Sequence, residues 1–307
     1  MDWIESRIQA IARDRRHGAA QLAGRAVEAL VTLCRRGRAS TPQDLARQVI
    51  TAALSIARIR PSMAPIHNWS VLFADRFSDL TQSVSSLEEL RRQGVRLGEE
   101  VRAQQQRLLR QQVEAARSLL ATCRSLVTVS YSSTVEAILR QALPRETKVT
   151  IAESRPLLEG RRLFSRLRES HPSLRMVTDA QLGLAVARAD LVLVGADSIL
   201  SDLAVVNKTG TYLAALAARA HHRGFYVAAD TFKIQATVDS HTCVLESRSG
   251  KEVWPRYAES CDNIYFDITP GHLVSGFVTD LGTLDGPRMA RQIRDWQEII
   301  ASLRHMR

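Results

Sequence analysis

Beyond residue 125 the chain alternates short apolar runs with segments of helical spacing, and this pattern constrains the fold more than any other feature. The segments between the runs, such as STVEAILRQA and AQLGLAVARA, have helical patterning. Strand, helix and strand at this period predict a doubly wound α/β domain, with a mostly parallel sheet covered on both faces. The six predicted strands are 125–130, 148–154, 174–178, 191–197, 225–230 and 263–269.

The first part of the chain has the patterning of helices alone. Thr41 precedes Pro42, as an N-cap precedes a proline at the first helical position, and this predicts a helix that ends before Pro61. Residues 85–120 contain almost no helix breakers and predict one long helix, with Gly94 and Gly98 as weak points. We therefore expect a helical domain over residues 1–124 and the α/β domain over residues 125–307.

The charge balance invites a nucleic-acid hypothesis but does not favour it. The net charge is +10 and comes almost entirely from arginine, yet the arginines alternate with glutamates and do not interleave with aromatic side chains. No apolar run approaches the roughly 20 residues that cross a bilayer, and the charged N-terminus lacks the apolar core of a signal peptide. These features predict a cytoplasmic protein without a membrane or nucleic-acid partner.

The four cysteines do not form a recognisable site. Cys34, Cys123, Cys243 and Cys261 are scattered, with no CxxC pair and no neighbouring histidine at ligand spacing. The pattern predicts isolated reduced thiols, with no zinc site, no other metal and no disulfide framework.

In a doubly wound sheet, ligands lie just beyond the carboxyl ends of the strands, near a switch in strand order. This rule nominates four strand ends: Ser130, Glu153 to Arg155, Asp197, and Asp230 with Lys233. No GxGxxG follows the first strand, so the dinucleotide fingerprint is absent.

The first two strand ends have the composition of an anion site. Ser132 and Ser133 lead into a predicted helix, whose N-terminal amides and dipole attract anions, although these serines also suit capping of the same helix. In ESRPLLEGRRL (153–163), Arg155 could clamp a phosphate and Gly160 could permit a close approach. An ordinary surface salt bridge by Arg155 is the alternative interpretation.

The third strand end, in GADSILSDLAVVNKTGTY (195–212), is more specific. Asp197 directly follows an apolar strand, where an unpaired carboxylate is costly. It could bond backbone amides within a turn. It could also be an acid or base, with Asn207 and Lys208 holding a phosphate or sugar oxygen beside it. Both interpretations remain open from the residues.

Six segments together resemble one superfamily: RIRPSMAPIHN (58–68), TVSYSSTVEAIL (128–139), ESRPLLEGRRL, GADSILSDLAVVNKTGTY, FYVAADTFKI (225–234) and FDITPGHLVSGFVTDLG (266–282). It unites the alpha, beta and delta regulatory subunits of translation initiation factor 2B with methylthioribose-1-phosphate isomerase and ribose-1,5-bisphosphate isomerase. The resemblance spans residues 40–285 and implies a helical N-terminal domain, a Rossmann-like C-terminal domain, and dimers or higher homo-oligomers built through the latter. The six segments occur in the order, and at about the spacing, seen in the superfamily.

The resemblance also implies roles for single residues. The isomerases use the aspartate of the GAD turn and a cysteine after the first strand of the domain for proton transfer. Asp197 matches the aspartate, whereas Ser130 stands at the cysteine position and Cys123 lies seven residues upstream. A hydroxyl is a far poorer acid than a thiol with a pKa of about 8.5, so Ser130 disfavours the isomerase mechanism.

The strand-end rule and the resemblance give one candidate set. Asp197 and Ser130 are the candidate catalytic residues. Asn207 and Lys208 match the superfamily's substrate-binding pair, and Arg60 matches its early Arg-Pro. The candidate substrate- or phosphate-binding residues are Arg60, Ser132, Ser133, Arg155, Gly160, Asn207, Lys208 and Lys233.

Two functions remain open from the sequence. The first is a protein that binds a sugar phosphate or nucleotide, with aldose–ketose isomerisation of a ribose 1-phosphate, such as ribose 1,5-bisphosphate or methylthioribose 1-phosphate, as its possible reaction. In it Asp197 shuttles a proton and no cofactor is required. The second is a non-catalytic, initiation factor 2B-like regulatory subunit in translation initiation, whose partners include homologous subunits.

Overall fold

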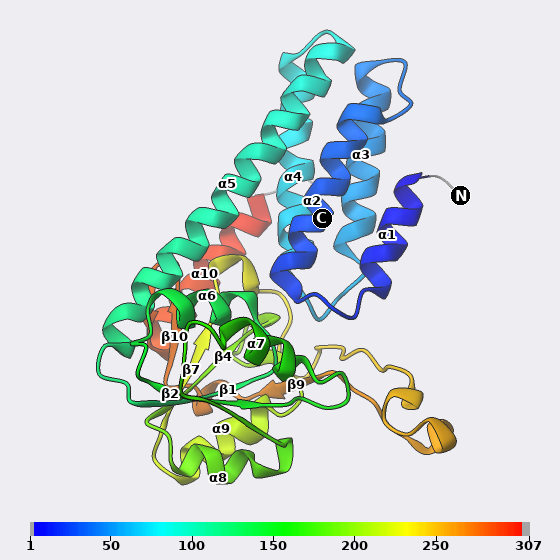
Figure 1. Cartoon of the computed structure of the whole chain (residues 1–307). Helices are drawn as coiled ribbons and strands as arrows, with labels where there is room; N and C mark the ends of the chain where they lie inside the picture. Colours follow the sequence, from blue (N-terminus) through cyan, green and yellow to red (C-terminus); the bar gives the residue numbers. More distant parts are fainter. Residues whose placement is uncertain (1–2, 303–307) are drawn as a thin grey trace. The chain divides into compact units, whose positions relative to one another are not determined.

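The computed structural model describes residues 3–302 (Figure 1). The chain divides into two compact units. A helical unit runs to Arg107 and takes up the chain again from Asp295, and an α/β unit comprises Leu108–Arg294. The predicted fold class, a helical N-terminal part followed by a mostly parallel α/β sheet, is confirmed.

The helical unit is built on three helices that pack side by side, α2, α3 and α4 (Figure 1). The predicted cap of α3 is confirmed, because the Thr41 hydroxyl accepts a hydrogen bond from the main-chain N–H of Asp44 at 3.1 Å. The predicted long helix is also confirmed as α5, which ends in the α/β unit. The helices are α1 (Trp3–Arg13), α2 (Ala19–Arg36), α3 (Pro42–Ala57), α4 (Ala64–Ser83) and α5 (Leu87–Leu120).

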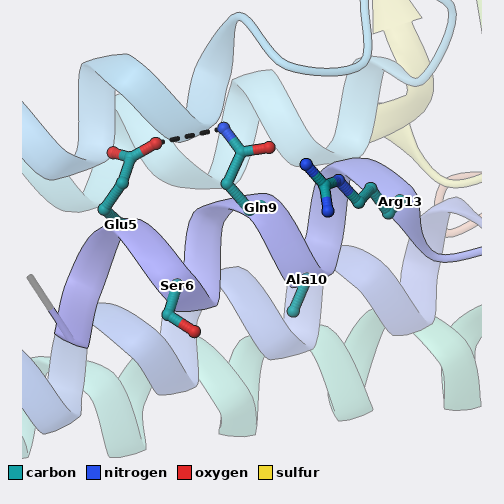
Figure 2. Close-up of a pocket in the computed structure, with 5 residues that line it drawn as sticks. All are labelled: Glu5, Ser6, Gln9, Ala10 and Arg13. Carbon is teal, nitrogen blue, oxygen red and sulfur yellow. Dashed lines mark hydrogen bonds between the residues drawn. The ribbon is translucent and has the colours of Figure 1, made fainter. Parts of the chain in front are cut away.

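Helix α1 is amphipathic. Ile8 and Ile11 are buried, and the polar residues lie on another face, where the Gln9 side chain donates a hydrogen bond to Glu5 at 3.0 Å (Figure 2). Figure 2 shows the five side chains of α1 that line a pocket, Glu5, Ser6, Gln9, Ala10 and Arg13. The apolar side of the helix therefore holds it in the unit.

The two glycines of α5 that the sequence presents as weak points are packing positions. A Cβ on Gly98 would lie 2.0 Å from Val31 Cγ2, and a Cβ on Gly94 would lie 2.6 Å from Phe77 Cε2. Only a residue without a side chain permits this approach of α5 to α2 and α4. The glycines lower the intrinsic helix propensity but allow α5 to pack closely in the helical unit.

The main sheet of the α/β unit has seven strands in the order β11-β10-β7-β4-β1-β2-β3. The six strands from β10 to β3 are parallel, and β11 pairs antiparallel with β10 at the edge. Numbered along the chain, the six parallel strands have the doubly wound order 3-2-1-4-5-6. The strands are β1 (Ser125–Val129), β2 (Lys148–Ala152), β3 (Leu174–Val177), β4 (Leu191–Gly195), β7 (Gly224–Ala228), β10 (Gly276–Thr279) and β11 (Gly282–Leu284).

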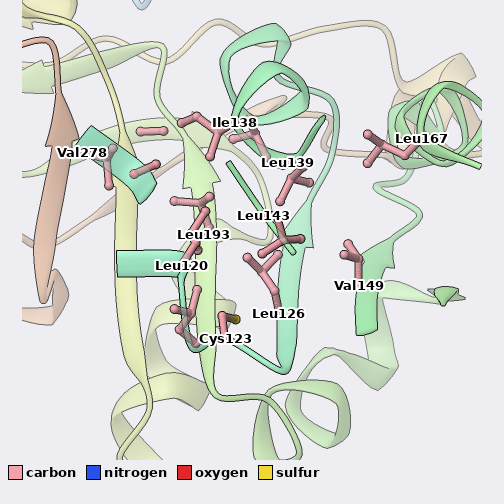
Figure 3. Packing of buried hydrophobic residues seen from close by; sticks show 14 of the residues in the cluster. Leu120, Cys123, Leu126, Ile138, Leu139, Leu143, Val149, Leu167, Leu193 and Val278 are labelled. Carbon is pink, nitrogen blue, oxygen red and sulfur yellow. The ribbon is translucent and has the colours of Figure 1, made fainter. Parts of the chain in front are cut away.

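Helices cover both faces of this sheet. The end of α5, with α6 (Ser133–Gln141) and α7 (Glu159–Leu167), packs on one face, and α8 (Leu182–Ala187) with α9 (Thr211–Ala220) lies on the other (Figure 1). Figure 3 shows the core of the first face, where the end of α5 meets α6 and strands β1, β2 and β4. Strands buried on both faces read as continuous apolar runs, which is why the sequence pattern located them.

A second sheet lies beyond the carboxyl ends of β4 and β7, with strand order β8-β5-β6-β9. Strand β5 (Ser198–Leu200) follows β4 after two residues, and β8 (Ile234–Gln235) follows β7. The prediction that residues 263–269 join the main sheet is wrong. Their strand, β9 (Phe266–Thr269), pairs antiparallel with β6 (Val205–Lys208), and the sixth parallel strand is β10.

The rest of the α/β unit is short turns and one terminal helix. Helix α10 (Gly286–Ser302) ends in the helical unit. Among the helices within residues 3–302, none has the length and apolar character that crossing a membrane requires. The 3₁₀ turns are η1 (Asp179–Gln181), η2 (Thr231–Lys233), η3 (Gly250–Glu252), η4 (Pro255–Ser260) and η5 (Gly271–Leu273).

Candidate functional site

The strand order of the main sheet reverses between β1 and β4. From β1 the chain passes outward to β2 and β3, and then returns to place β4 on the other side of β1. Helices leaving β1 and β4 therefore diverge to opposite faces, which opens the crevice where ligands bind in such sheets. The residues that follow the two strands, Ser130 and Asp197, stand at this point.

The end of β1 turns sharply into α6. Ser130 has φ of 66° and is 6% exposed, so a non-glycine residue holds the left-handed backbone conformation at the strand end. Ser132 comes next to the end of β4, because a Cβ on Gly195 would lie 2.6 Å from the Ser132 hydroxyl oxygen. The loop after β1 and the end of β4 thus touch at the switch point.

Of the two candidate serines, Ser132 is the helix cap. Its hydroxyl accepts a hydrogen bond from the main-chain N–H of Val135 at 3.3 Å, and Ser133 is the first residue of α6. A hydroxyl that accepts one hydrogen bond still has its own hydrogen to donate. Capping by Ser132 is therefore compatible with an anion bound at the N-terminus of α6.

At the end of β2, Arg155 is exposed and held through its backbone. Both oxygens of Asp179 accept main-chain hydrogen bonds, from Ser154 at 2.8 Å and from Arg155 at 2.7 Å. The Arg155 guanidinium donates to the main-chain oxygen of Val253 at 3.3 Å. This contact places the guanidinium beside the main chain of Val253.

Gly160 serves the close approach that the sequence suggests, and the group that it approaches is the chain itself. A Cβ at Gly160 would lie 2.0 Å from the main-chain oxygen of Ala152, at the end of β2. Its N–H donates to the main-chain oxygen of Glu153 at 3.2 Å. Gly160 therefore seats the start of α7 against β2.

Asp197 joins the two sheets. It lies between β4 and β5, is 9% exposed, and donates its main-chain N–H to the oxygen of Val206 at 2.8 Å. The strands before and after it, β4 and β5, are each paired within a sheet, and they hold Asp197 at the switch point. A carboxyl in this position is shielded from water.

Asn207 and Lys208 lie on β6, the strand that precedes α9. The Asn207 amide donates to the Thr211 hydroxyl at 2.9 Å, so it braces the turn into α9. Lys208 is 5% exposed; its ammonium donates to Glu159 Oε1 at 2.9 Å and lies 4.7 Å from the centre of the Tyr265 ring. Glu159 and Tyr265 thus define the surroundings of the lysine.

Lys233 lies in a separate charged group at the end of β7. It is 3% exposed, and it faces the carboxyl of Asp230, which is itself near Asp280. Burial raises the pKa of Asp230, and Asp280 raises it further, while the positive charge of Lys233 opposes both. Asp280 also accepts hydrogen bonds from the main chain and hydroxyl of Thr231.

Arg60 lies in the helical unit. It is 3% exposed, and its guanidinium donates to the main-chain oxygen of Asp14 at 3.1 Å. Its assignment to the candidate site stays a prediction from the resemblance.

Cys123 lies far from the switch point. It lies seven residues before Ser130, and the five residues of β1 between them span about 16 Å of extended chain. Its side chain belongs to the apolar core, and burial raises the pKa of its thiol to about 11. Cys123 therefore does not replace a thiol at the position of Ser130.

Two carboxylates that sequence reasoning did not select lie against the predicted residues. Glu159 pairs with Lys208, and Asp267 accepts hydrogen bonds from the main-chain N–H groups of Gly210 and Tyr212 at the start of α9. Burial raises the pKa of Asp267 to about 6. The only local signal for Glu159 is an acidic residue directly before Gly160, and Asp267 has no signal beyond its place in an apolar run.

Comparison with known proteins agrees with this architecture. A profile described as the Initiation factor 2 subunit family matches residues 15–286. The chain is 33% identical over 283 residues to a putative translation initiation factor eIF-2B subunit 2-like protein of Pyrococcus horikoshii, with 92% of this chain and 96% of that protein covered.

An enzyme and a solved structure are also similar. A methylthioribose-1-phosphate isomerase of Pelotomaculum thermopropionicum is 31% identical over 301 residues, covering 91% of this chain and 82% of the enzyme. The crystal structure of the translation initiation factor eIF-2B of P. horikoshii superposes with a TM-score of 0.80 and 31% identity, covering 94% of this chain and 99% of that one. Similarity therefore extends to both branches, proteins named as initiation factor 2B subunits and a methylthioribose-1-phosphate isomerase.

Proposed function

Because the chain belongs to the Initiation factor 2 subunit family, we propose that it binds a phosphorylated ribose compound or a nucleotide at the carboxyl edge between β1 and β4. In this proposal the protein is a non-catalytic, initiation factor 2B-like regulatory subunit in translation initiation, and the bound ligand serves that role. Asp197 and Ser130 lie at the switch point, with Ser132 and Ser133 as donors to the phosphate, and Lys208 as its cation.

One observation carries this proposal. Ser132, the cap of α6, comes into contact range of Gly195 at the end of β4, two residues before Asp197. The N-terminus of α6 is thereby brought to the end of the strand that leads to Asp197. Main-chain N–H groups, serine hydroxyls and the helix dipole together suit a phosphate, and the polar residue Asp197 suits the hydroxyls of a sugar.

Aldose–ketose isomerisation is the second candidate, and the burial of Asp197 favours it. Moving a proton between two sugar carbons needs a carboxylate shielded from water and one further group that exchanges a proton with the sugar oxygen. Ser130 stands where the isomerases have a thiol, and its hydroxyl is a weak acid. The non-catalytic function therefore comes first and the isomerase second.

A binding experiment tests the first candidate. Ribose 1,5-bisphosphate, methylthioribose 1-phosphate and adenosine monophosphate are each added, and the melting temperature is measured. A ligand present at 100 times its Kd adds about 2.7 kcal/mol to the stability of the folded state. For a unit of this size we expect a rise of about 5–10 °C for at least one of the three. No rise at millimolar concentrations contradicts the proposal.

Product analysis by NMR separates the two candidates. If the protein is an isomerase, the wild type converts one of the two ribose phosphates into its ketose, and Asp197→Asn lowers the rate by about 10³-fold. Ketose formed equally well by Asp197→Asn removes Asp197 as the proton carrier. No product from the wild type, with a gain of product in Ser130→Cys, supports the non-catalytic function on an isomerase-like site.

Copies of this chain are expected to associate through the α/β unit, as the family resemblance implies. Three leucines on neighbouring helices support this, Leu184 on α8 with Leu213 and Leu216 on α9, which are 66%, 60% and 41% exposed. Apolar side chains grouped on one surface mark interfaces. We expect light scattering to give at least twice the mass of 34.2 kDa, and Leu213→Glu to lower the mass. A monomer at micromolar concentration contradicts this proposal.

A further inference from the structure

The ammonium group of Lys208 already has an anionic partner within the chain. Glu159 Oε1 lies 2.9 Å from it, and the two side chains are 6% and 22% exposed. The Tyr265 ring lies 4.7 Å from the same ammonium. A cation expected to hold a ligand's phosphate is therefore enclosed by a carboxylate and an aromatic ring.

Loss of this ion pair would be costly for Lys208 and less costly for Glu159. An ammonium buried to this degree is strongly destabilised without an anion, so Lys208 must always have one. Glu159 is the first residue of α7, where the helix dipole stabilises an acidic side chain in any case. Its Oε2 is buried and has no hydrogen-bond partner among residues 3–302, so the carboxylate is only half satisfied in the pair.

The ion pair also joins elements that are distant in sequence. Glu159 starts α7 and follows β2, whereas Lys208 ends β6 of the second sheet, 49 residues later. Beyond the lysine, Tyr265 donates its hydroxyl hydrogen to Glu252, which also accepts from the Asn263 amide. Tyr265 is thus held by Glu252 on one side of Lys208, and Glu159 is the partner that can be exchanged.

We propose that Glu159 is an affinity-setting residue, an internal carboxylate that holds Lys208 until the phosphate of a ligand takes its place. The inference rests on the proposed function. Exchange of one anion for another keeps the buried ammonium paired throughout. A phosphate dianion has more charge and more acceptor oxygens than a carboxylate and displaces it, whereas a carboxylate ligand gains nothing over Glu159. The ion pair therefore selects for phosphate dianions.

Removing the charge of Glu159 tests this directly. We expect Glu159→Gln to tighten the Kd of adenosine monophosphate at least 10-fold by calorimetry, because the ligand no longer competes with a carboxylate. We also expect citrate, a carboxylate probe, to bind the variant and not the wild type. In the double variant with Lys208→Met, both gains are expected to disappear.

A matched variant controls for the change in net charge. Glu114→Gln removes the same charge from the same unit, where Glu114 pairs with the exposed Arg117 at 2.7 Å, and we expect its Kd to stay within twofold of the wild type. Urea unfolding of Glu159→Gln verifies that the variant is folded. Glu159→Asp provides a second test, since it keeps the charge and shortens the side chain, and we expect a tightening smaller than that of Glu159→Gln.

The outcomes distinguish this inference from the proposed function. If the wild type binds adenosine monophosphate through Lys208 and Glu159→Gln binds it no more tightly, the inference is wrong and the proposed function stands. If no protein in the set binds adenosine monophosphate, ribose 1,5-bisphosphate or methylthioribose 1-phosphate at millimolar concentration, both are wrong. Tighter binding that persists without Lys208 also overturns the inference.

Discussion

Gly160→Ala is expected to lower the free energy of unfolding of the α/β unit by about 3 kcal/mol or more. The added Cβ would lie 2.0 Å from the main-chain oxygen of Ala152 and 3.0 Å from the Cα of Glu153. Both are backbone atoms of a strand end, so no side-chain rotation relieves the contact. The start of α7 must move away from β2, which also strains the Gly160 hydrogen bond to Glu153 at 3.2 Å.

The same displacement reaches the candidate site. Glu159 precedes Gly160 and holds Lys208 at 2.9 Å, so movement of α7 separates the ion pair. We therefore expect hydrogen exchange in Gly160→Ala to rise most over residues 153–168, as urea denaturation records the loss of stability. The intrinsic preference of helices for alanine, about 1 kcal/mol, acts in the opposite direction and is too small to compensate.

Gly183→Ala is the matched control. Gly183 lies in α8 of the same unit, and a Cβ there would meet no atom within 4 Å. With space available, the substitution is expected to raise stability by up to about 1 kcal/mol. Equal effects of the two substitutions would contradict the contact between α7 and β2.

The sequence predicted the parallel strands well because a strand that is buried on both faces is apolar at nearly every position. The burial of β4 is continuous, and its run LVLVG is apolar throughout. The strands of the second sheet do not form such long apolar runs. Strands β5 and β8 have three and two residues, and their pairing depends on chain segments more than 30 residues apart. Residues 263–269 have more strand-forming side chains than GFVT, yet the latter occupies the buried place beside β7.

At the candidate site, the sequence located the ends of the strands but not the partners of the polar side chains that lie there. The carboxyl-end rule needs only the order of strands and helices, so it selected Ser130, Asp197 and the end of β2. The pairing of Lys208 with Glu159 follows from the path of the second sheet, which no local pattern encodes. The tertiary structure determines which buried polar groups meet. The sequence predicts only that each buried polar group has a partner.

Asp267 is expected to make the protein less stable as the pH rises from about 4 to about 6. Burial is the largest effect on its carboxyl and raises the pKa from 3.8 to about 6, although N–H groups at the start of α9 favour the charged form. Below pH 4 the carboxyl is protonated in the folded and unfolded states. Between pH 4 and 6 only the unfolded state loses its proton, so the free energy of unfolding falls by about 3 kcal/mol and then stays level.

Asp267→Asn removes this titration while its amide oxygen can still accept the N–H groups of Gly210 and Tyr212, at 2.7 and 3.1 Å from the carboxylate. We expect the fall in stability between pH 4 and pH 7, measured by urea denaturation, to be about 3 kcal/mol smaller in the variant than in the wild type. Comparing two profiles cancels the titration of every other group. Asp239→Asn is the control of opposite sign, because hydrogen bonds from Thr242 lower the pKa of Asp239 and its stabilising effect is lost in acid. Parallel profiles for the wild type and Asp267→Asn would mean that the helix N-terminus, and not burial, governs this carboxyl.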